Sequence, residues 1–425
     1  MSHINLINRY KSQTKDVSAY LLASIIPAFI SLLVNPLIAK NMSPEDYAIV
    51  GFYSSFSLLL TPLLSFYLNH YLGKRFYECD VEGRKQLKAT ILRIFLIISP
   101  ILSLIALFGI WVYKTFFNEG SVIPFFPYSL FYVCSLYLTI YYSLEQMDLK
   151  MHRKSGTFLK LALLHSALIV GTTLLLVVLF KFGAVGKMLA TVIEASILFI
   201  IVLVRNEELL KYSVSIKEIK VAMSFCLPLV LAAMLSFFTK GYDSVLLERL
   251  GNTKEFALYS IGLQFSAYLG MFTTAIQNTF QSDIYEAVSH NNRSKLLKLA
   301  LMFFLVSAVV VSLFCLLAPI IVKILTMGRY TLAAKYARVC SISLVFSVLY
   351  YFVSTIFIAR GHNKMTLINK ISIALFSMIA FPFMIGRYQY IGAGITLSII
   401  FLLSTVNLYF INFIYNNVGL FKNRR

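Results

Sequence analysis

Long apolar runs separated by short polar loops dominate the chain. Six windows contain no charged residue, and all but the last have the length of one bilayer-spanning helix, which needs ~20 mostly apolar residues. Six further windows carry a few polar or charged interruptions. The pattern therefore predicts an all-α, polytopic membrane protein of twelve transmembrane helices. The charge-free windows are 17–39, 94–113, 221–239, 299–322, 339–359 and 388–421, and the interrupted windows are 47–72, 123–144, 159–180, 185–204, 256–281 and 365–385.

Basic residues concentrate in alternate loops. The two terminal segments and the even-numbered loops together hold 25 Lys and Arg residues, including Arg360, Lys364 and Lys370 before span eleven, whereas the odd-numbered loops hold 11. Because cytoplasmic loops of membrane proteins carry the excess of Lys and Arg, the richer side is predicted to be cytoplasmic. Both termini are then cytoplasmic, which requires an even number of spans. Residues 1–15 contain no apolar stretch, so we expect span one to be an uncleaved anchor.

A local sequence pattern recurs in the two halves of the chain. Residues 40–48, between spans one and two, match residues 249–257, between spans seven and eight, at an offset of 209. Gly186 before span six and Gly392 before span twelve form a second pair at an offset of 206. The repeats predict two six-helix bundles in parallel around a central cavity. The expected domains are an N-terminal bundle at 1–204, a cytoplasmic hinge loop at 205–220 and a C-terminal bundle at 221–425.

Composition agrees with a membrane protein and disfavours other classes. Hydrophobic residues make up 59% of the chain and charged residues 13%, against roughly 45–50% and about 25% in soluble proteins. The net charge of +20 would suggest nucleic acid in a soluble chain, but here it matches basic loops beside an anionic lipid leaflet. No nucleic-acid partner is therefore expected. The five cysteines suggest neither a disulfide framework nor a metal site.

Catalytic motifs are absent from the sequence. It contains no zinc-protease, nucleophile-elbow or phosphate-loop pattern, so the parts for metal or serine catalysis and for ATP hydrolysis are missing. We therefore predict transport and not bond chemistry, with no cofactor. The candidate site residues are polar and ionisable groups inside the spans, since a charge at mid-membrane costs roughly 2.5–3.5 kcal/mol on insertion scales.

Three ionisable residues in the spans are the main candidates. Glu194 lies near the middle of span six, where it either couples transport to protons or is a neutral, hydrogen-bonded carboxyl. Lys240 and Asp243 lie three residues apart at the outer end of span seven, and they share a face if the helix continues. They then form either an ion pair or a cationic point for a pyrophosphate, with Asp243 tuning or coupling it.

Further candidates have equally plain structural explanations. Arg93, at the cytoplasmic start of span three, either extends to the lipid headgroups or captures a lipid pyrophosphate. Gln264 and Gln277 in span eight either bind sugar hydroxyls or hold helices together. His165 in span five is more often an interhelical hydrogen-bonding residue than a proton carrier.

Several short motifs resemble those of a known transporter family. Residues 243–251 read Asp-Ser-Val-Leu-Leu-Glu-Arg-Leu-Gly and precede Glu-Phe-Ala-Leu-Tyr-Ser at 255–260, residues 359–364 read Ala-Arg-Gly-His-Asn-Lys, and residues 390–394 read Tyr-Ile-Gly-Ala-Gly. In this order the motifs resemble the polysaccharide-biosynthesis transporters, specifically the Wzx-type flippases of the superfamily that includes MATE exporters and lipid II flippases. The likeness covers essentially the whole chain. One departure is Leu258, where many relatives have glycine.

The resemblance implies a flippase of the bacterial inner membrane. It would move an undecaprenyl-pyrophosphate-linked oligosaccharide from the cytoplasmic to the periplasmic leaflet by alternating access, for O-antigen or capsule synthesis. The implied partners are this lipid-linked oligosaccharide, the inner-membrane lipids and a downstream polysaccharide polymerase. Two alternatives stay open. A MATE-like cation-coupled exporter would favour an acidic cavity, and a membrane polymerase or glycosyltransferase would carry a large extramembrane loop, whereas the longest loop here, 73–92, has about 20 residues.

Overall fold

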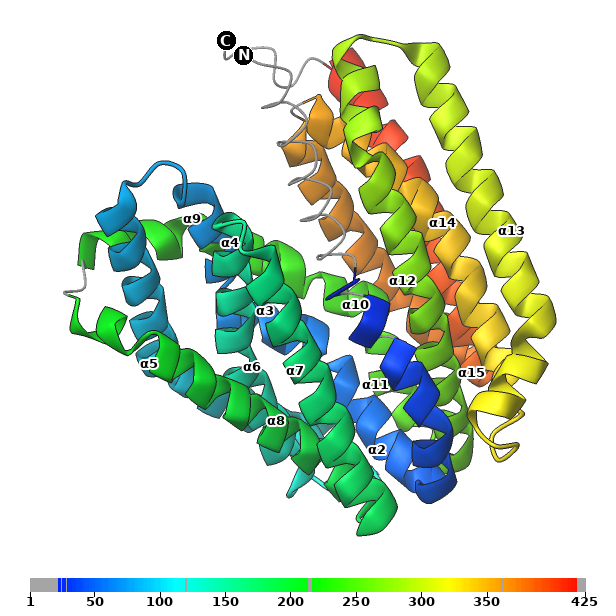
Figure 1. Cartoon of the computed structure of the whole chain (residues 1–425). Helices are drawn as coiled ribbons and strands as arrows, with labels where there is room; N and C mark the ends of the chain where they lie inside the picture. The colour runs from blue at the N-terminus through cyan, green and yellow to red at the C-terminus, as the bar shows by residue number, and fades with distance from the viewer. Residues whose placement is uncertain are drawn as a thin grey trace, which may run out of the picture. The chain divides into compact units, whose positions relative to one another are not determined.

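The protein is helical throughout its described part. A computed structural model describes residues 22–418, except positions 24, 28, 119–120, 213–215 and 361. All regular elements in these residues are helices (Figure 1), which confirms the predicted all-α fold. The predicted cytoplasmic ends, residues 1–21 and 419–425, lie outside the described residues.

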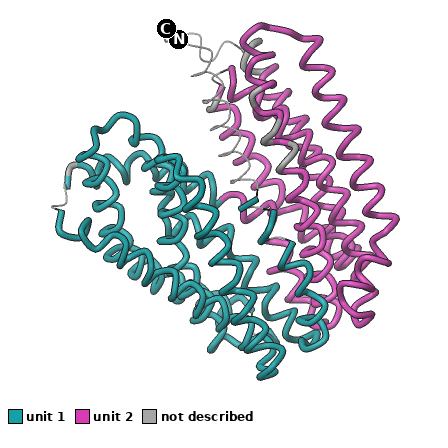
Figure 2. The backbone as a smooth tube through the Cα atoms, in the orientation of Figure 1, with its two compact units in different colours: residues 1–234 teal, residues 235–425 magenta. Residues whose placement is uncertain are grey.

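The helices form two compact units, residues 1–234 and 235–425 (Figure 2). In the first unit, α6 packs against α5, α7 and α8, so it is the central helix of this bundle. One core cluster joins α4, α5, α6 and α9 through Tyr71, Phe95, Tyr141 and Cys226. The elements of this unit are α2 (Pro44–Ser55), α3 (Ser57–Ser65), α4 (Leu68–Arg75), α5 (Val81–Val112), the π-helix η1 (Tyr113–Phe117), α6 (Tyr128–Met151), α7 (Ser155–Thr173), the π-helix η2 (Leu174–Leu179), α8 (Gly183–Arg205), the 3-10 helix η3 (Glu207–Lys211) and α9 (Ile216–Met234).

The second unit is built around α14. This helix packs against α12, α13 and α15, and Figure 1 shows the four long helices running side by side. Phe303, Phe352 and Phe357 belong to the core cluster between them. The elements of this unit are α10 (Ser236–Lys240), α11 (Tyr242–Glu248), α12 (Thr253–Ser289), α13 (Arg293–Leu325), α14 (Ala333–Ala359) and α15 (Asn363–Val418).

Most helices have the length of a membrane span. Among the described residues, seven helical stretches are long and apolar enough to cross a bilayer, or up to eight if the bent pair α2 and α3, which meet at 45°, forms one span. Helix α15 contains both predicted spans eleven and twelve, and Gln389, at the start of span twelve, breaks it with φ 49° and ψ −133°. The protein is therefore a multi-pass membrane protein, while the count of twelve spans stays a prediction.

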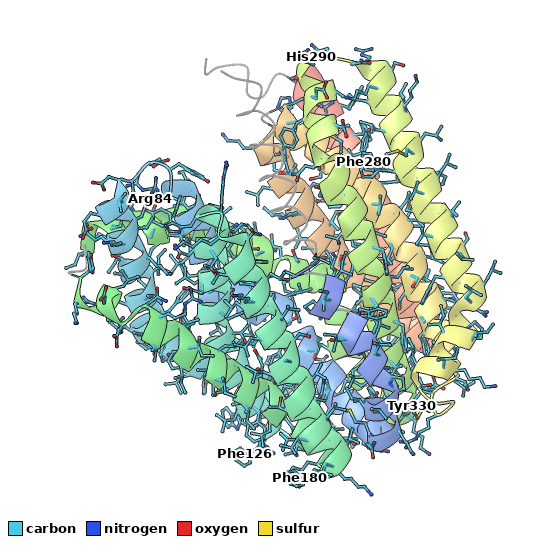
Figure 3. All side chains as sticks on the ribbon, in the orientation of Figure 1. Arg84, Phe126, Phe180, Phe280, His290 and Tyr330 are labelled. Carbon is cyan, nitrogen blue, oxygen red and sulfur yellow. The ribbon has the colours of Figure 1, made fainter. Side chains whose placement is uncertain are left out.

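Alternate loops lie at opposite ends of the helices in each unit. In Figure 3, Arg84 lies at one end of the first unit, and Phe126 and Phe180 lie at the other. His290 and Tyr330 lie at opposite ends of the second unit. Arg84 and His290 adjoin loops rich in Lys and Arg, whereas the other three residues adjoin loops from the set with fewer Lys and Arg residues. Each unit therefore has the alternation on which the predicted orientation depends.

Helix α9 packs with the first unit, although its sequence was expected to begin the second bundle. It contacts α3, α4 and α5. The Glu218 carboxylate accepts a hydrogen bond of 2.6 Å from the Tyr71 hydroxyl on α4, and the Lys74 ammonium lies 4.2 Å from the centre of the Phe225 ring. The division between the units thus follows Met234. The role of residues 205–220 as a hinge stays a prediction.

The repeated sequence pattern marks an equivalent helix start in each unit. Ser43 is the N-cap of α2, and its hydroxyl and the Asp46 carboxylate each accept a hydrogen bond from the other residue's backbone amide. This is a capping box, which satisfies two amides that the helix leaves unpaired. Asn252 caps α12 with one such bond, which its side chain accepts from the Glu255 amide. The carboxylate of Asp46 also accepts a hydrogen bond from the Ala184 amide, which attaches the start of α8.

The paired glycines mark equivalent close approaches. A Cβ atom at Gly186 would lie 2.9 Å from the carbonyl oxygen of Leu176, and one at Gly392 would overlap the carbonyl oxygen of Met384. Each glycine therefore allows the start of a helix to pass the backbone of the preceding segment.

Gly392→Ala is expected to destabilise the protein by about 1–3 kcal/mol, because the added methyl group overlaps a backbone carbonyl and forces the chain apart. The measurement is thermal or denaturant unfolding of the purified protein. Gly386→Ala on the same helix is the matched control, since nothing lies within 4 Å of a Cβ atom at that position. Equal stability of the two variants would contradict the close approach.

Candidate functional site

Gly241 interrupts the helix that was expected to place Lys240 and Asp243 on one face. Helix α10 ends at Lys240, α11 begins at Tyr242, and Gly241 between them has φ −133° and ψ −20°. The continuous helix that brings residues i and i+3 together is therefore lost. In the described part of the chain, the two side chains do not form an ion pair but contact different helices.

Asp243 is fully buried within the second unit. Its Oδ2 atom accepts a hydrogen bond from the Tyr259 hydroxyl on α12. Its Oδ1 atom has no hydrogen-bond partner among the described residues. The Tyr259 ring in turn packs edge-on against Tyr336 on α14, with ring centres 5.8 Å apart. These contacts attach α11 to α12, which gives Asp243 a structural function, and its coupling role stays a prediction.

Lys240 extends toward α15. Its Nζ atom lies 5.2 Å from the centre of the Phe401 ring, and the side chain is exposed. A cation over an aromatic face is held by only about 0.5–1 kcal/mol where water has access. So weak a contact leaves the side chain able to turn to an anionic ligand.

Gln264 and Gln277 lie on the same helix, α12, but not at one place. Thirteen residues separate them, which is about 20 Å along a helix and more than a third of a turn around it. The Gln264 amide donates a hydrogen bond of 2.8 Å to the Tyr268 hydroxyl one turn later. The two glutamines therefore cannot contact the same sugar, and the role of each stays a prediction.

Glu194 has a titratable neighbour inside the first unit. Its side chain on α8 is 4% exposed, and its Oε1 atom lies 3.4 Å from Nε2 of His165 on α7. The His165 ring stacks on Tyr142 of α6 at 4.8 Å between ring centres, and Gln146 donates a 2.6 Å hydrogen bond to the Tyr142 hydroxyl. His165 therefore contacts neighbouring helices, as expected. The cluster of Glu194, His165, Tyr142 and Gln146 also places two proton-binding groups side by side.

Arg93 has a backbone partner. Its Nη2 atom donates a hydrogen bond to the carbonyl oxygen of Leu210 in η3, which holds η3 against α5. A guanidinium group has five N–H donors, so one such bond leaves the others available. The contact favours a structural role for Arg93, and capture of a pyrophosphate stays a prediction.

The first unit contains a buried charge network that was not predicted from the sequence. The Lys88 ammonium lies 2.8 Å from Glu145 and 2.7 Å from Asp148, both on α6. Glu145 also lies 3.2 Å from Arg205 and accepts a 3.1 Å hydrogen bond from Asn206 after α8. The network joins α5, α6 and α8. The sequence feature that could have indicated it is the pair Glu145 and Asp148, two acidic residues three positions apart at the end of span four that adjoins basic residues.

Lys88→Ala is expected to destabilise the first unit by about 3–5 kcal/mol, because it leaves two carboxylates without their shared cation in a buried site. The measurement is thermal unfolding of the purified protein, together with its level in the membrane. Lys85→Ala is the matched control, since Lys85 is exposed and its ion pair among the described residues is with exposed Glu82. Its stability should stay close to that of the wild type. A Lys88→Ala protein as stable as this control would show that the network contributes little.

Solved transporter structures share this fold. The chain is similar to an inward-facing multidrug resistance MATE family transporter of the MOP superfamily, with a TM-score of 0.71 and 15% identity over 95% of this chain and 99% of that one. It is similar to the lipid II flippase MurJ in an inward closed conformation, with a TM-score of 0.69 and 17% identity over 92% and 86%. A MOP superfamily transporter from Pyrococcus furiosus, described as having a binding pocket of reverse polarity, gives a TM-score of 0.58 and 16% identity over 94% and 96%. The fold is thus that of MATE and MurJ transporters.

The sequence places the chain within a family of that class. A family model described as "Polysaccharide biosynthesis protein" matches residues 13–280, more than half of the chain. The protein belongs to this family. No curated protein matches the chain by sequence.

Proposed function

We propose that the protein is a flippase that moves an undecaprenyl-pyrophosphate-linked oligosaccharide from the cytoplasmic to the periplasmic leaflet of a bacterial inner membrane. The observation that carries the proposal is Lys240, an exposed cation on a membrane-spanning helical stretch that contacts an aromatic ring and forms no ion pair in the described residues. Family membership and the fold shared with a lipid II flippase support it. The exported oligosaccharide would supply a polymerase that builds O-antigen or capsule.

The substrate explains why such a protein is needed. A sugar headgroup cannot cross hydrocarbon unaided, because each hydroxyl group would lose its hydrogen-bond partners. In the proposed cycle the two halves open alternately to each side of the membrane, and the lipid tail stays in the bilayer. The pyrophosphate would bind at Lys240 while the sugars cross. A proton gradient or consumption of the product would drive the cycle.

A cation exporter on the same fold is the rival function. Its substrate would be a lipophilic cation, which needs a carboxylate and is repelled by an ammonium group. In the second unit, Asp243 is fully buried against Tyr259, whereas Lys240 is exposed. The accessible charge therefore suits an anionic substrate better.

Transport by the purified protein tests the proposed function. The full chain is reconstituted into vesicles with a fluorescent polyprenyl-pyrophosphate oligosaccharide, and loss of fluorescence to an impermeant reductant reports the fraction that reaches the outer leaflet. The protein should accelerate this exchange. Vesicles with a fluorescent phosphatidylcholine control for general lipid scrambling. Equal rates with and without protein, or equal rates for the two lipids, would overturn the proposal.

The proposed orientation has both termini in the cytoplasm, because the terminal segments and loops on that side hold 25 basic residues against 11 on the other. A reporter that is active only in the periplasm should therefore give no signal when fused after Arg425. The same reporter after Thr253 should give one. A positive signal from the fusion after Arg425 would contradict the orientation.

A further inference from the structure

Two aromatic residues interrupt predicted span two in the first unit. The window at 47–72 predicts one helix, but the structure divides it into α2, α3 and α4. Between α3 and α4, Phe66 has φ 44° and ψ 25°, and Tyr67 has φ 55° and ψ 20°. Both residues therefore lie in the left-handed region, where the backbone crowds the Cβ atom of any residue other than glycine. The break between the two helices is strained.

The local sequence does not explain this break. Residues 63–72 contain neither glycine nor proline, the residues that most often interrupt a helix within a span. Pro62 lies inside α3, where it disturbs the turn before it and not the two residues of the break. A continuous helix is therefore the conformation that this stretch favours by itself.

Neighbouring helices hold the break in place. The Ser99 hydroxyl on α5 donates a hydrogen bond of 2.8 Å to the carbonyl oxygen of Leu64. The Cys226 thiol on α9 donates one of 3.7 Å to the carbonyl oxygen of Tyr67. The Tyr67 ring stacks on His70 at 4.6 Å between ring centres. Tertiary contacts thus maintain a backbone conformation that opposes the local preference, a conflict that is typical of functional elements.

The equivalent span of the second unit is unbroken. The offset of 209 between the repeated sequence patterns places positions 66 and 67 opposite positions 275 and 276, and α2 and α12 begin at this same offset. Positions 275 and 276 lie within α12, which is a single helix of 37 residues (Figure 1). One repeat of the fold therefore takes the continuous form, and the other takes the broken form.

Helix α4, on one side of the break, carries contacts that attach α9. The Tyr71 hydroxyl donates a 2.6 Å hydrogen bond to the Glu218 carboxylate, and Nε of Arg75 lies 3.6 Å from the same carboxylate. The Lys74 ammonium lies 4.2 Å from the centre of the Phe225 ring. A change in the direction of α4 therefore displaces α9 or breaks these contacts.

We propose that Phe66 and Tyr67, here called the aromatic hinge, switch between this broken form and a continuous α3–α4 helix, and that the switch moves α9. Strain raises the free energy of the broken form, while the contacts from α5 and α9 lower it. The two forms then differ little in free energy, so a small change in packing shifts the population from one to the other. The aromatic hinge operates whatever the protein transports.

Glycine and alanine at one position separate backbone strain from lost packing. Phe66→Gly and Phe66→Ala both lose the ring, but only glycine has no Cβ atom to crowd, so Phe66→Gly should melt about 2–4 °C above Phe66→Ala. Leu63, inside α3, is the matched control, because alanine is the better helix former there and Leu63→Ala should melt above Leu63→Gly. The measurement is thermal unfolding of the purified full chain. Phe66→Gly melting below Phe66→Ala would overturn the aromatic hinge.

Distances across the break report the switch itself. Spin labels on encoded azide-bearing amino acids replace Thr61 in α3 and Tyr77 just after α4, both exposed, and leave the native cysteines in place. Double electron–electron resonance should show two populations in the wild type, one of them matching a single helix with the two backbones about 24 Å apart. Phe66→Gly/Tyr67→Gly should deplete this continuous population, whereas Phe66→Ala/Tyr67→Ala should enrich it. The same distance distribution in all three proteins would overturn the aromatic hinge.

A second pair of labels follows α9. Thr61 and Lys220, an exposed residue in α9, receive the labels in the wild type and in the same two double variants. The distance between them should change in parallel with the distance across the break. A Thr61–Lys220 distance that stays constant while the other changes would overturn the movement of α9.

Discussion

Lys240→Ala is expected to abolish transport of the lipid-linked oligosaccharide, while Lys240→Arg keeps part of it. The pyrophosphate needs a fixed cation, and arginine supplies one with different geometry. The measurement is the initial rate of translocation in vesicles, at equal amounts of inserted protein. Removal of an exposed lysine should not disturb folding, so wild-type melting behaviour is expected in both variants.

The double variant Lys240→Ala/Asp243→Ala distinguishes an anion site from an ion pair. If the two charges only neutralised each other, removing both would restore transport. The structure instead directs Asp243 to Tyr259 and Lys240 to Phe401, so the double variant should stay inactive. Lys254→Ala, an exposed lysine at the start of α12, controls for loss of one positive charge and should transport normally. Restored transport in the double variant would contradict the role of Lys240.

The helical architecture could be predicted from sequence because bilayer thickness sets the length of an apolar run. Helices occur at the predicted windows in the described part of the chain, and local chemistry marks several of their starts. Ser43 and Asn252 cap helices through hydrogen bonds to residues three positions away. Such bonds depend on neighbouring residues alone, so one sequence is enough to reveal them.

The candidate site was harder to predict, because its contacts join residues far apart in the chain. Lys88 and Glu145 are 57 positions apart, and no local pattern pairs them. Lys370 was assigned by its basic neighbours, although the bond between Asn369 and Asn407 places it inside the helical unit. The separation of Lys240 from Asp243 depends on the backbone at Gly241. The sequence shows the glycine, but tertiary packing decides in which direction the helix axis bends at that residue.

Glu194→Gln is expected to abolish transport that depends on a proton gradient. Glutamine keeps the size of the side chain and its hydrogen bonding, but it cannot gain or lose a proton. The structure places His165 at 3.4 Å from Glu194, and Tyr142 stacks on His165, within a cluster that three helices enclose. A proton bound there changes the charge of the cluster, so it can favour one packing of the three helices over another. The measurement is vesicle transport with and without an imposed pH gradient.

Two further variants decide whether the proton or the packing matters. His165→Phe keeps the ring that stacks on Tyr142 but removes the partner of Glu194, so it should weaken the response to the gradient while preserving thermal stability. Glu208→Gln makes the same chemical change at an exposed position in η3 and should respond to the gradient as the wild type does. If Glu194→Gln transports at the wild-type rate under the gradient, the carboxyl is structural. The energy for the proposed flippase would then come from a source other than proton binding at Glu194. Lys240 and Glu194 lie in different units, so the proposal for one residue can be wrong while the proposal for the other holds.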